Sequence, residues 1–150
     1  MKTTSQNLEE THDLAERFVH EIVLECAEEK QKEAMVIGLY GDLGSGKTSF
    51  VQGIGNALKV KENIISPTFI IQKRYNIPKP DSPFKHLIHI DTYRLEGDHE
   101  MKDIKWDELI SDPTNLIVME WASKVEGVMP KHTKKIFFTF IDENTREIEW

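Results

Sequence analysis

The chain has 150 residues, of which 39 % are apolar and 30 % charged, and this length and composition predict one domain over residues 1–150 with a single hydrophobic core. Its net charge of −7 argues against a broad nucleic-acid surface, because phosphate backbones are bound by patches of Lys and Arg. No apolar run approaches the ~20 residues that cross a bilayer, no secretory leader is visible, and the single Cys26 suits a reducing compartment, so we expect a cytoplasmic protein with no membrane partner.

The first predicted element is an amphipathic helix over residues 8–30. Asn7, followed three residues later by Glu10, resembles a capping box at its start. Its apolar stripe recurs at helical spacing and consists of Leu8, Leu14, Phe18, Ile22 and Cys26.

A glycine-rich motif follows the next predicted element, a buried strand over residues 35–40. Residues 41–48 read GDLGSGKT, which matches the phosphate-binding pattern G-x-x-x-x-G-K-T, and a helix is predicted from Thr48 to near Leu58. A strand, a glycine-rich turn and a helix N-terminus together make an anion site. We expect Lys47 to reach the β- and γ-phosphates of a nucleotide and the Thr48 hydroxyl to bind Mg²⁺. The predicted nucleotide-binding residues of this segment are Gly41, Asp42, Leu43, Gly44, Ser45, Gly46, Lys47, Thr48 and Ser49.

The second half of the chain alternates between strands and polar connections. A strand over residues 69–77 and another over 86–91 are joined by a proline-rich loop, which predicts an antiparallel pair and therefore a mixed sheet. The other predicted elements are a charged irregular segment at 97–104, a short helix at 106–110, a buried strand at 115–120, and a C-terminal hairpin of strands 135–141 and 146–150 with its turn at 142–145.

Two of these strands end in a carboxylate. Asp91 follows the apolar run 87–90, and Glu120 follows the apolar run 116–119. A phosphate-binding loop needs an acid to complete the Mg²⁺ shell, and a strand end beside the loop is the usual source of that acid. Mg²⁺ keeps several waters, so one of the two acids can act directly and the other through water. The residues alone do not rank Asp91 against Glu120.

Several residues near these strand ends are further active-site candidates, although each also has an ordinary structural explanation. Ser66 and Thr68 can form a loop that orders at the γ-phosphate, or Thr68 can simply begin a strand. His89 shares a sheet face with Asp91 and can equally be a buried core histidine. The others are Tyr93 and Arg94, which a solvated turn would also explain, and Trp121, which packing would also explain.

Three functions are compatible with this motif set: an ATPase, a small-molecule kinase and a nucleotide sensor that does not hydrolyse. The Asp-x-x-Gly and Asn-Lys-x-Asp signatures of a GTPase are absent. The four arginines do not cluster into the lid with which nucleotide kinases hold two substrates.

In their order and spacing, the motifs resemble the TsaE family, the bacterial tRNA threonylcarbamoyladenosine biosynthesis ATPases. The resemblance covers about residues 5–150 and rests on GDLGSGKT at 41–48, SPTF at 66–69, HIDTYR at 89–94 and Glu120-Trp121. The chain departs from the family at Ser45, where alanine is usual, and at Ala122, where proline often follows the Glu-Trp pair. The segment 105–108 also lacks a common glycine.

The resemblance implies an α/β fold, namely a three-layer P-loop NTPase-like domain with a mixed, partly antiparallel sheet and a C-terminal hairpin. It implies ATP and Mg²⁺ as cofactors, with Thr48 and Glu120 on the metal and Asp91 in the active site, on water or on metal. It also implies a switch-like loop around Ser66 and Thr68, with catalytic roles for Lys47, Asp91 and Glu120. Thr11 and Arg146 match family positions near the nucleotide.

The resemblance further implies two partner proteins, which transfer a threonylcarbamoyl group to adenosine 37 of tRNAs that read ANN codons. By the same likeness this subunit hydrolyses ATP, resets the complex and meets tRNA only through its partners. We expect weak hydrolysis without those partners.

Overall fold

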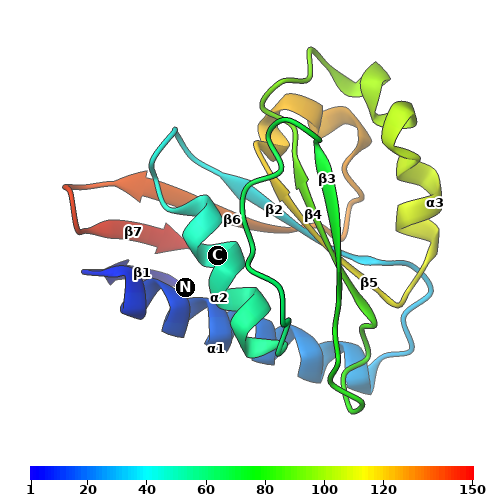
Figure 1. The fold of residues 1–150 in the computed structure, drawn as a ribbon, viewed down its shortest axis with the longest axis horizontal. Helices are drawn as coiled ribbons and strands as arrows, with labels where there is room; N and C mark the ends of the chain where they lie inside the picture. The colour runs from blue at the N-terminus through cyan, green and yellow to red at the C-terminus, as the bar shows by residue number, and fades with distance from the viewer.

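The computed structural model describes residues 1–150, and its centre is a seven-stranded sheet in the order β1-β7-β6-β2-β5-β4-β3 (Figure 1). β6, β2, β5 and β4 run parallel, whereas β3, β7 and β1 each pair antiparallel with their neighbours. The mixed sheet, its antiparallel β3–β4 pair and the C-terminal hairpin are therefore confirmed. The strands are β1 (Lys2–Ser5), β2 (Met35–Tyr40), β3 (Gln72–Asn76), β4 (His86–Asp91), β5 (Asn115–Glu120), β6 (Lys134–Phe140) and β7 (Arg146–Glu149).

Helical layers cover both faces of the sheet, as the three-layer prediction requires. Alternate residues of β2 face opposite sides: Ile37 and Leu39 belong to one buried cluster, and Val36 belongs to the other. The helices α1 (Leu8–Glu28) and α2 (Lys47–Ala57) close the first cluster. The second is closed by α3 (Trp106–Ser111) and the 3₁₀ helices η1 (Asp98–Ile104) and η2 (Ala122–Val128). None of the helices is both long enough and apolar enough for a membrane crossing.

The start of α1 confirms the Asn7 half of the predicted capping box, whereas Glu10 reaches back to Gln6 instead of to the Asn7 N–H, and the predicted stripe is corrected. The Asn7 side chain accepts the Glu10 N–H at 2.9 Å, and the Gln6 N–H donates to the Glu10 carboxylate at 2.7 Å. Leu8, predicted to be in the apolar stripe, is instead 56 % exposed, because it is the first helical residue and precedes the turns that pack on the sheet. Cys26 is buried in the core, and this burial raises the pKa of its thiol to about 11.

Two other predicted segments differ from the structure, and two elements were not predicted. The strand predicted over 69–77 begins only at Gln72, because the Ile70 and Ile71 N–H groups both donate to the Pro67 carbonyl and close a turn. The segment predicted to be irregular at 97–104 contains η1. The edge strand β1 and the helix η2 were not predicted; β1 has only four residues and depends on distant β7 for its pairing.

Replacing Gly53 of α2 by alanine is expected to destabilise the protein by about 1–2 kcal/mol, the difference between an overpacking cost of about 2–3 kcal/mol and a helix-propensity gain of about 1 kcal/mol. A Cβ at this position would lie 2.7 Å from the Ala15 Cβ and 2.9 Å from the His12 Cα, where α1 crosses α2. This overpacking exceeds the gain of about 1 kcal/mol that alanine brings to a helix interior. Urea unfolding measures the effect, and Asn56→Ala on the exposed side of the same helix is the matched control. A Gly53→Ala protein as stable as the parent would contradict the close helix crossing.

Candidate nucleotide-binding site

The glycine-rich turn between β2 and α2 leaves the N-terminus of α2 open. The first intrahelical bond joins the Phe50 N–H to the Gly46 carbonyl, so the N–H groups at 46–49 have no partner within the helix. No side chain caps this end, because the capping position is Gly46, with a φ of 102°. A side chain at Gly41 is also excluded, since its Cβ would lie 2.7 Å from the Phe138 carbonyl oxygen. The turn therefore has the geometry of an anion site, as the motif predicts.

Lys47 is held over this turn by the turn's own oxygens. Its ammonium donates to the carbonyls of Gly41 at 2.6 Å and Asp42 at 2.7 Å, and it lies 4.3 Å from the centroid of the Trp121 ring. Burial lowers the pKa of the Lys47 ammonium, while the neighbouring Glu120 opposes that shift. A buried cation with only neutral hydrogen-bond partners is well placed to pair with an anionic ligand.

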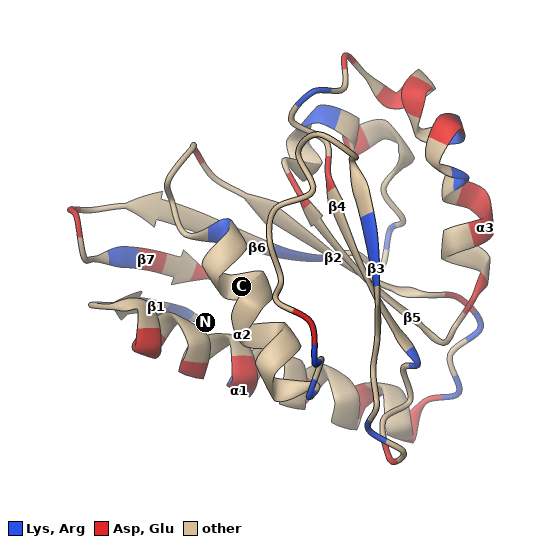
Figure 2. Cartoon of the chain, in the orientation of Figure 1, with Lys and Arg blue, Asp and Glu red and all other residues tan.

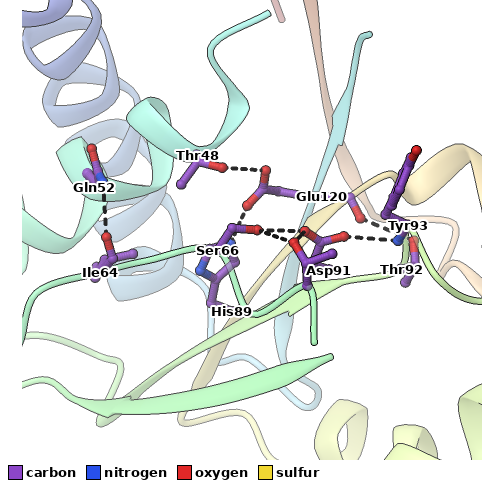
Figure 3. Close-up of polar contacts among 10 residues, drawn as sticks. Thr48, Gln52, Ile64, Ser66, His89, Asp91, Thr92, Tyr93 and Glu120 are labelled. Atoms are coloured by element: carbon purple, nitrogen blue, oxygen red, sulfur yellow. Dashed lines mark hydrogen bonds and ion pairs between the residues drawn. The ribbon is translucent and has the colours of Figure 1, made fainter. Parts of the chain in front are cut away.

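The strand order brings both predicted acids to the turn. β5 lies between β2 and β4, and Glu120 is in register with Leu39 on one side and with Asp91 on the other. The Thr48 hydroxyl donates to the Glu120 carboxylate at 2.8 Å, across the gap between α2 and the sheet (Figure 3). Thr48 and Glu120 therefore form a pair of oxygen donors beside the turn.

His89 lies behind Glu120 and does not reach the cavity. Its ring is fully buried, and Nε2 lies 2.5 Å from the Glu120 carboxylate oxygen that Thr48 does not use (Figure 3). The other ring nitrogen, Nδ1, has no partner, so the hydrogen-bond network assigns the proton to Nε2 and makes it the donor. The prediction that His89 shares a face with Asp91 is confirmed, and its contact fixes the orientation of Glu120.

Asp91 holds the predicted switch-like loop. Ser66 and Thr68 both donate to one of its carboxylate oxygens, at 2.6 and 2.9 Å, and the Tyr93 N–H donates to the other oxygen at 2.9 Å (Figure 3). The two acids at the strand ends therefore have different partners: Glu120 contacts the helix of the glycine-rich turn, and Asp91 contacts the loop before β3.

These groups surround one cavity of about 560 Å³, a volume typical of small-molecule sites. Its lining includes most of the predicted site, namely Thr11, Leu43, Gly44, Ser45, Gly46, Lys47, Thr48, Ser49, Ser66, Thr68, Asp91, Tyr93, Glu120, Trp121 and Arg146. Four lining residues were not predicted: Asn7, Leu8, Glu143 and Asn144. They flank Thr11 and Arg146 in sequence, and this proximity is the signal that could have found them.

Three of the predicted residues besides His89 lie outside this lining. Gly41 and Asp42 act through the carbonyls that accept from Lys47. Arg94 does not line the cavity, and its guanidinium lies 5.5 Å from the centroid of the Phe69 ring. The Arg146 guanidinium donates to the Asp142 and Thr145 carbonyls, while its buried Nε has no partner at the cavity edge.

The donor set fits magnesium better than a protein-caged metal. No group of three or more His, Cys, Asp and Glu side chains gathers anywhere in the structure. The Thr48 hydroxyl and the Glu120 carboxylate are hard oxygen donors beside an anion site, and Mg²⁺ is typically bound by one or two carboxylates together with phosphates and water.

The parallel core, the glycine-rich turn and the carboxylates at neighbouring strand ends define a P-loop NTPase-like α/β protein. A crystal structure of Bacillus subtilis YdiB has the same fold, with a TM-score of 0.69 and 30 % identity over 99 % of this chain and 82 % of that one. The family model for the threonylcarbamoyl adenosine biosynthesis protein TsaE matches residues 5–148, so the chain belongs to the TsaE family.

Individual proteins of this family are similar to the chain over about three quarters of its length. The tRNA threonylcarbamoyladenosine biosynthesis protein TsaE of Nostoc sp. is 35 % identical over 120 residues, which is 76 % of this chain and 68 % of the relative. The protein of that name from Bacillus subtilis is 34 % identical over 117 residues, or 78 % of this chain and 69 % of the relative.

Proposed function

We propose that this protein binds ATP with Mg²⁺ and hydrolyses it as a cytoplasmic subunit of the machinery that makes N6-threonylcarbamoyladenosine at position 37 of tRNA. The family and its relatives named for this pathway support the biological context. The observation that carries the proposal is the Thr48–Glu120 pair at 2.8 Å beside the open end of α2. This pair supplies metal ligands where the turn supplies phosphate ligands.

Each residue of the cavity has a role in this proposal. Lys47 exchanges its loop carbonyls for the β- and γ-phosphates. Thr48 and Glu120 would hold Mg²⁺, which would neutralise charge on the phosphates, and His89 keeps Glu120 in place. Asp91 would orient the attacking water, or would face the metal through water, once Ser66 and Thr68 release its carboxylate.

The far end of the cavity is where the nucleoside lies in this proposal. Thr11 and the unpredicted Asn7 come from the start of α1, whereas Asn144 and Arg146 come from the β6–β7 hairpin. Thr11 is buried, and its hydroxyl shares a hydrogen bond of 2.5 Å with the Ser5 hydroxyl. The junction of β1 and α1 therefore fixes the part of the cavity wall that Thr11 forms. The segments flank the glycine-rich turn, on which the phosphates lie in this proposal.

Isolated protein is expected to hydrolyse ATP slowly, and the two proposed partner proteins are expected to accelerate it. Lys47 is the only lysine that lines the cavity, and the terminal nitrogens of Arg146, the other lining cation, are engaged by hairpin carbonyls. A second cation at the γ-phosphate typically contributes ~10³–10⁵ in rate, and a partner can supply it. Phosphate release measured with and without the partners tests this expectation.

The same assay separates the alternatives. If the isolated protein released phosphate as fast as it does with the partners present, the proposal that partners accelerate its ATP hydrolysis would be contradicted. ADP release that depends on a small-molecule acceptor would instead indicate a kinase, and ATP binding with no phosphate release under any condition would indicate a sensor. The net charge of −7 supports contact with tRNA only through the partners.

A further inference from the structure

A second hollow lies between the edge strand β3 and the helices η1 and α3. Its volume is about 670 Å³, which is within the range of small-molecule sites. Asn115 lies on its wall at the start of β5, whereas Glu120 of the nucleotide cavity ends the same strand. The hollow shares no lining residue with the nucleotide cavity. A ligand in this hollow would therefore not overlap with a bound nucleotide.

One buried acceptor on the wall of the hollow has no partner within the protein. Asn115 is 1 % exposed, and its Nδ2 donates to the Leu109 carbonyl at 3.1 Å. This bond determines which end of the amide is the oxygen, because a carbonyl accepts only from the NH₂ group. The Asn115 Oδ1 is left without a donor. A buried oxygen without a donor costs free energy, so a donating group in the hollow would be stabilised by it.

Two further acceptors lie beside Asn115. His86 begins β4 in register with Asn115, so both side chains lie on one face of the sheet, and the buried His86 Nδ1 has no partner. Asp112 also lines the hollow, and it accepts from Thr114 through one of its oxygens only. The bonds from Thr114 hold the pKa of Asp112 below its usual range, and the nearby Arg74 acts in the same direction. These acceptors suit an ammonium group, which has three donors and no acceptor.

Charged side chains of both signs rim the hollow. Arg74 comes from β3 and Lys105 from the junction of η1 and α3, and the acidic members are Asp103, Glu108 and Asp112. Figure 2 shows basic colour on β3 and acidic colour on η1 and α3. None of these five charges is in an ion pair within the protein, whereas four lysines elsewhere pair with glutamates. Unpaired charges of both signs in one hollow suit a ligand that carries both.

Other occupants fit this hollow less well. A metal ion is opposed by the cations of Arg74 and Lys105, and no group of three or more metal-binding side chains gathers in the structure. A phosphate or a nucleic acid is opposed by the three carboxylates. The apolar part of the wall consists of Ile70, Ile104 and Leu109. Aliphatic side chains of this kind can cover a short aliphatic group, but they offer no surface for aromatic stacking.

We propose that this hollow binds a free α-amino acid with a branched aliphatic side chain. The ammonium of the ligand donates to the Asn115 Oδ1 and to Asp112, and its carboxylate accepts from Arg74. Its side chain packs on the apolar part of the wall. The combination that carries this inference is a buried, unpartnered acceptor next to unpaired charges of both signs. The inference does not depend on the proposed function, because the two cavities are separate.

Titration of the protein with L-leucine, followed by ¹H–¹⁵N NMR, tests the site directly. We expect saturable shifts that are largest at the Asn115 side-chain NH₂, with a Kd of about 1 mM or tighter. L-Leucinamide, which lacks the carboxylate, and N-acetyl-L-leucine, which lacks the ammonium, are each expected to bind at least about tenfold more weakly. No binding of L-leucine at about 10 mM would overturn the proposal and leave the Asn115 Oδ1 to an ordered water. Equal binding of L-leucinamide would overturn it as well.

Arg74→Ala tests the carboxylate contact, because Arg74 is exposed and makes no hydrogen bond or ion pair on which the fold depends. We expect it to weaken L-leucine binding at least about tenfold, whereas Arg17→Ala, at an exposed arginine of α1, is expected to match the parent. Unchanged affinity in Arg74→Ala would overturn the proposal.

Asn115→Ala tests the buried acceptor and is expected to abolish L-leucine binding. The Leu109 carbonyl loses its donor in this variant, so urea unfolding must first show that the variant is folded. L-Leucine binding by folded Asn115→Ala that equals the parent's would contradict the proposal, and if the variant does not fold, Arg74→Ala decides. Both variants are expected to bind ATP as the parent does. A parent that binds no ATP would refute the proposed function and leave this test of the hollow intact.

Discussion

Lys47→Ala is expected to weaken Mg-ATP binding by about 100-fold or more, because the variant loses the buried cation that faces the phosphates. Hydrogen bonds to charged groups contribute about 1.5–3 kcal/mol each, and every 1.4 kcal/mol is a factor of ten in affinity. Lys47 is 4 % exposed, and its ammonium is held by two carbonyls at 2.6 and 2.7 Å, so it is already positioned before the ligand arrives. Isothermal titration with ATP measures the loss.

The control for Lys47→Ala is Lys124→Ala. The Lys124 ammonium lies 5.3 Å from the centroid of the Tyr93 ring, close to the site but outside the cavity lining. This variant is expected to bind ATP as the parent does, which separates a specific contact from a general loss of positive charge. Equal affinities for the parent and Lys47→Ala would show that the glycine-rich turn does not receive phosphates.

Glu120→Gln is expected to remove most of the effect of Mg²⁺ on ATP binding and to slow phosphate release by about 10²-fold. The amide has almost the shape of the carboxylate, so the Thr48 bond can persist, and the His89 bond can persist with the other ring tautomer. The negative charge is lost, however, and Mg²⁺ requires hard anionic oxygen in this position. Titrations with ATP in Mg²⁺ and in EDTA, together with phosphate release, measure both effects.

Glu126→Gln is the matched control, because Glu126 is also a hydrogen-bonded carboxylate. Its partners are Tyr40 and Lys135, and it lies outside the cavity lining. The Lys135 ammonium and the Tyr40 hydroxyl hold the pKa of Glu126 below its usual range, so it is ionised at neutral pH. If Glu120→Gln keeps the full Mg²⁺ effect, Glu120 is not a metal ligand and Asp91 becomes the candidate.

Lys47, Glu120 and Asp91, the charged residues beside the glycine-rich turn, are each hydrogen-bonded within the protein itself. Lys47 is bound by carbonyls of its own loop, Glu120 by Thr48 and His89, and Asp91 by Ser66 and Thr68. A ligand must therefore replace these internal hydrogen bonds with its own. Its binding free energy reflects the difference between the bonds that are lost and the bonds that it forms.

The parts of the site that could be predicted from sequence are those encoded locally. The motif at 41–48 predicts both the turn and the helix that follows it. The apolar runs before Asp91 and Glu120 predict where two strands end, and this prediction does not need the order of the strands in the sheet. Because parallel strands end at one edge of a sheet, these local signals were enough to predict that both acids approach the turn.

The parts that could not be predicted depend on register and distant pairing. The residues alone left Asp91 and Glu120 unranked, since only the β4–β5 register and the path of α2 decide which acid meets Thr48. The contact of His89 with Glu120 likewise needs two strands in a known order.

The prediction at 69–71 failed for a different reason. An apolar run of this length usually indicates a buried strand. Phe69 and Ile70 are instead exposed, in a turn that precedes the strand. Local patterns tend to mislead at functional sites, where side chains serve a ligand or partner rather than the core. The failure here coincides with the loop whose Ser66 and Thr68 side chains donate to Asp91 at the cavity.

The most direct test of the account is isothermal titration of the unmodified protein with ATP, first in Mg²⁺ and then in EDTA. A triphosphate at the open end of α2, with its metal between Thr48 and Glu120, predicts saturable one-to-one binding that is tighter in Mg²⁺. No binding of ATP or ADP in Mg²⁺, even with the partner proteins added, would contradict it.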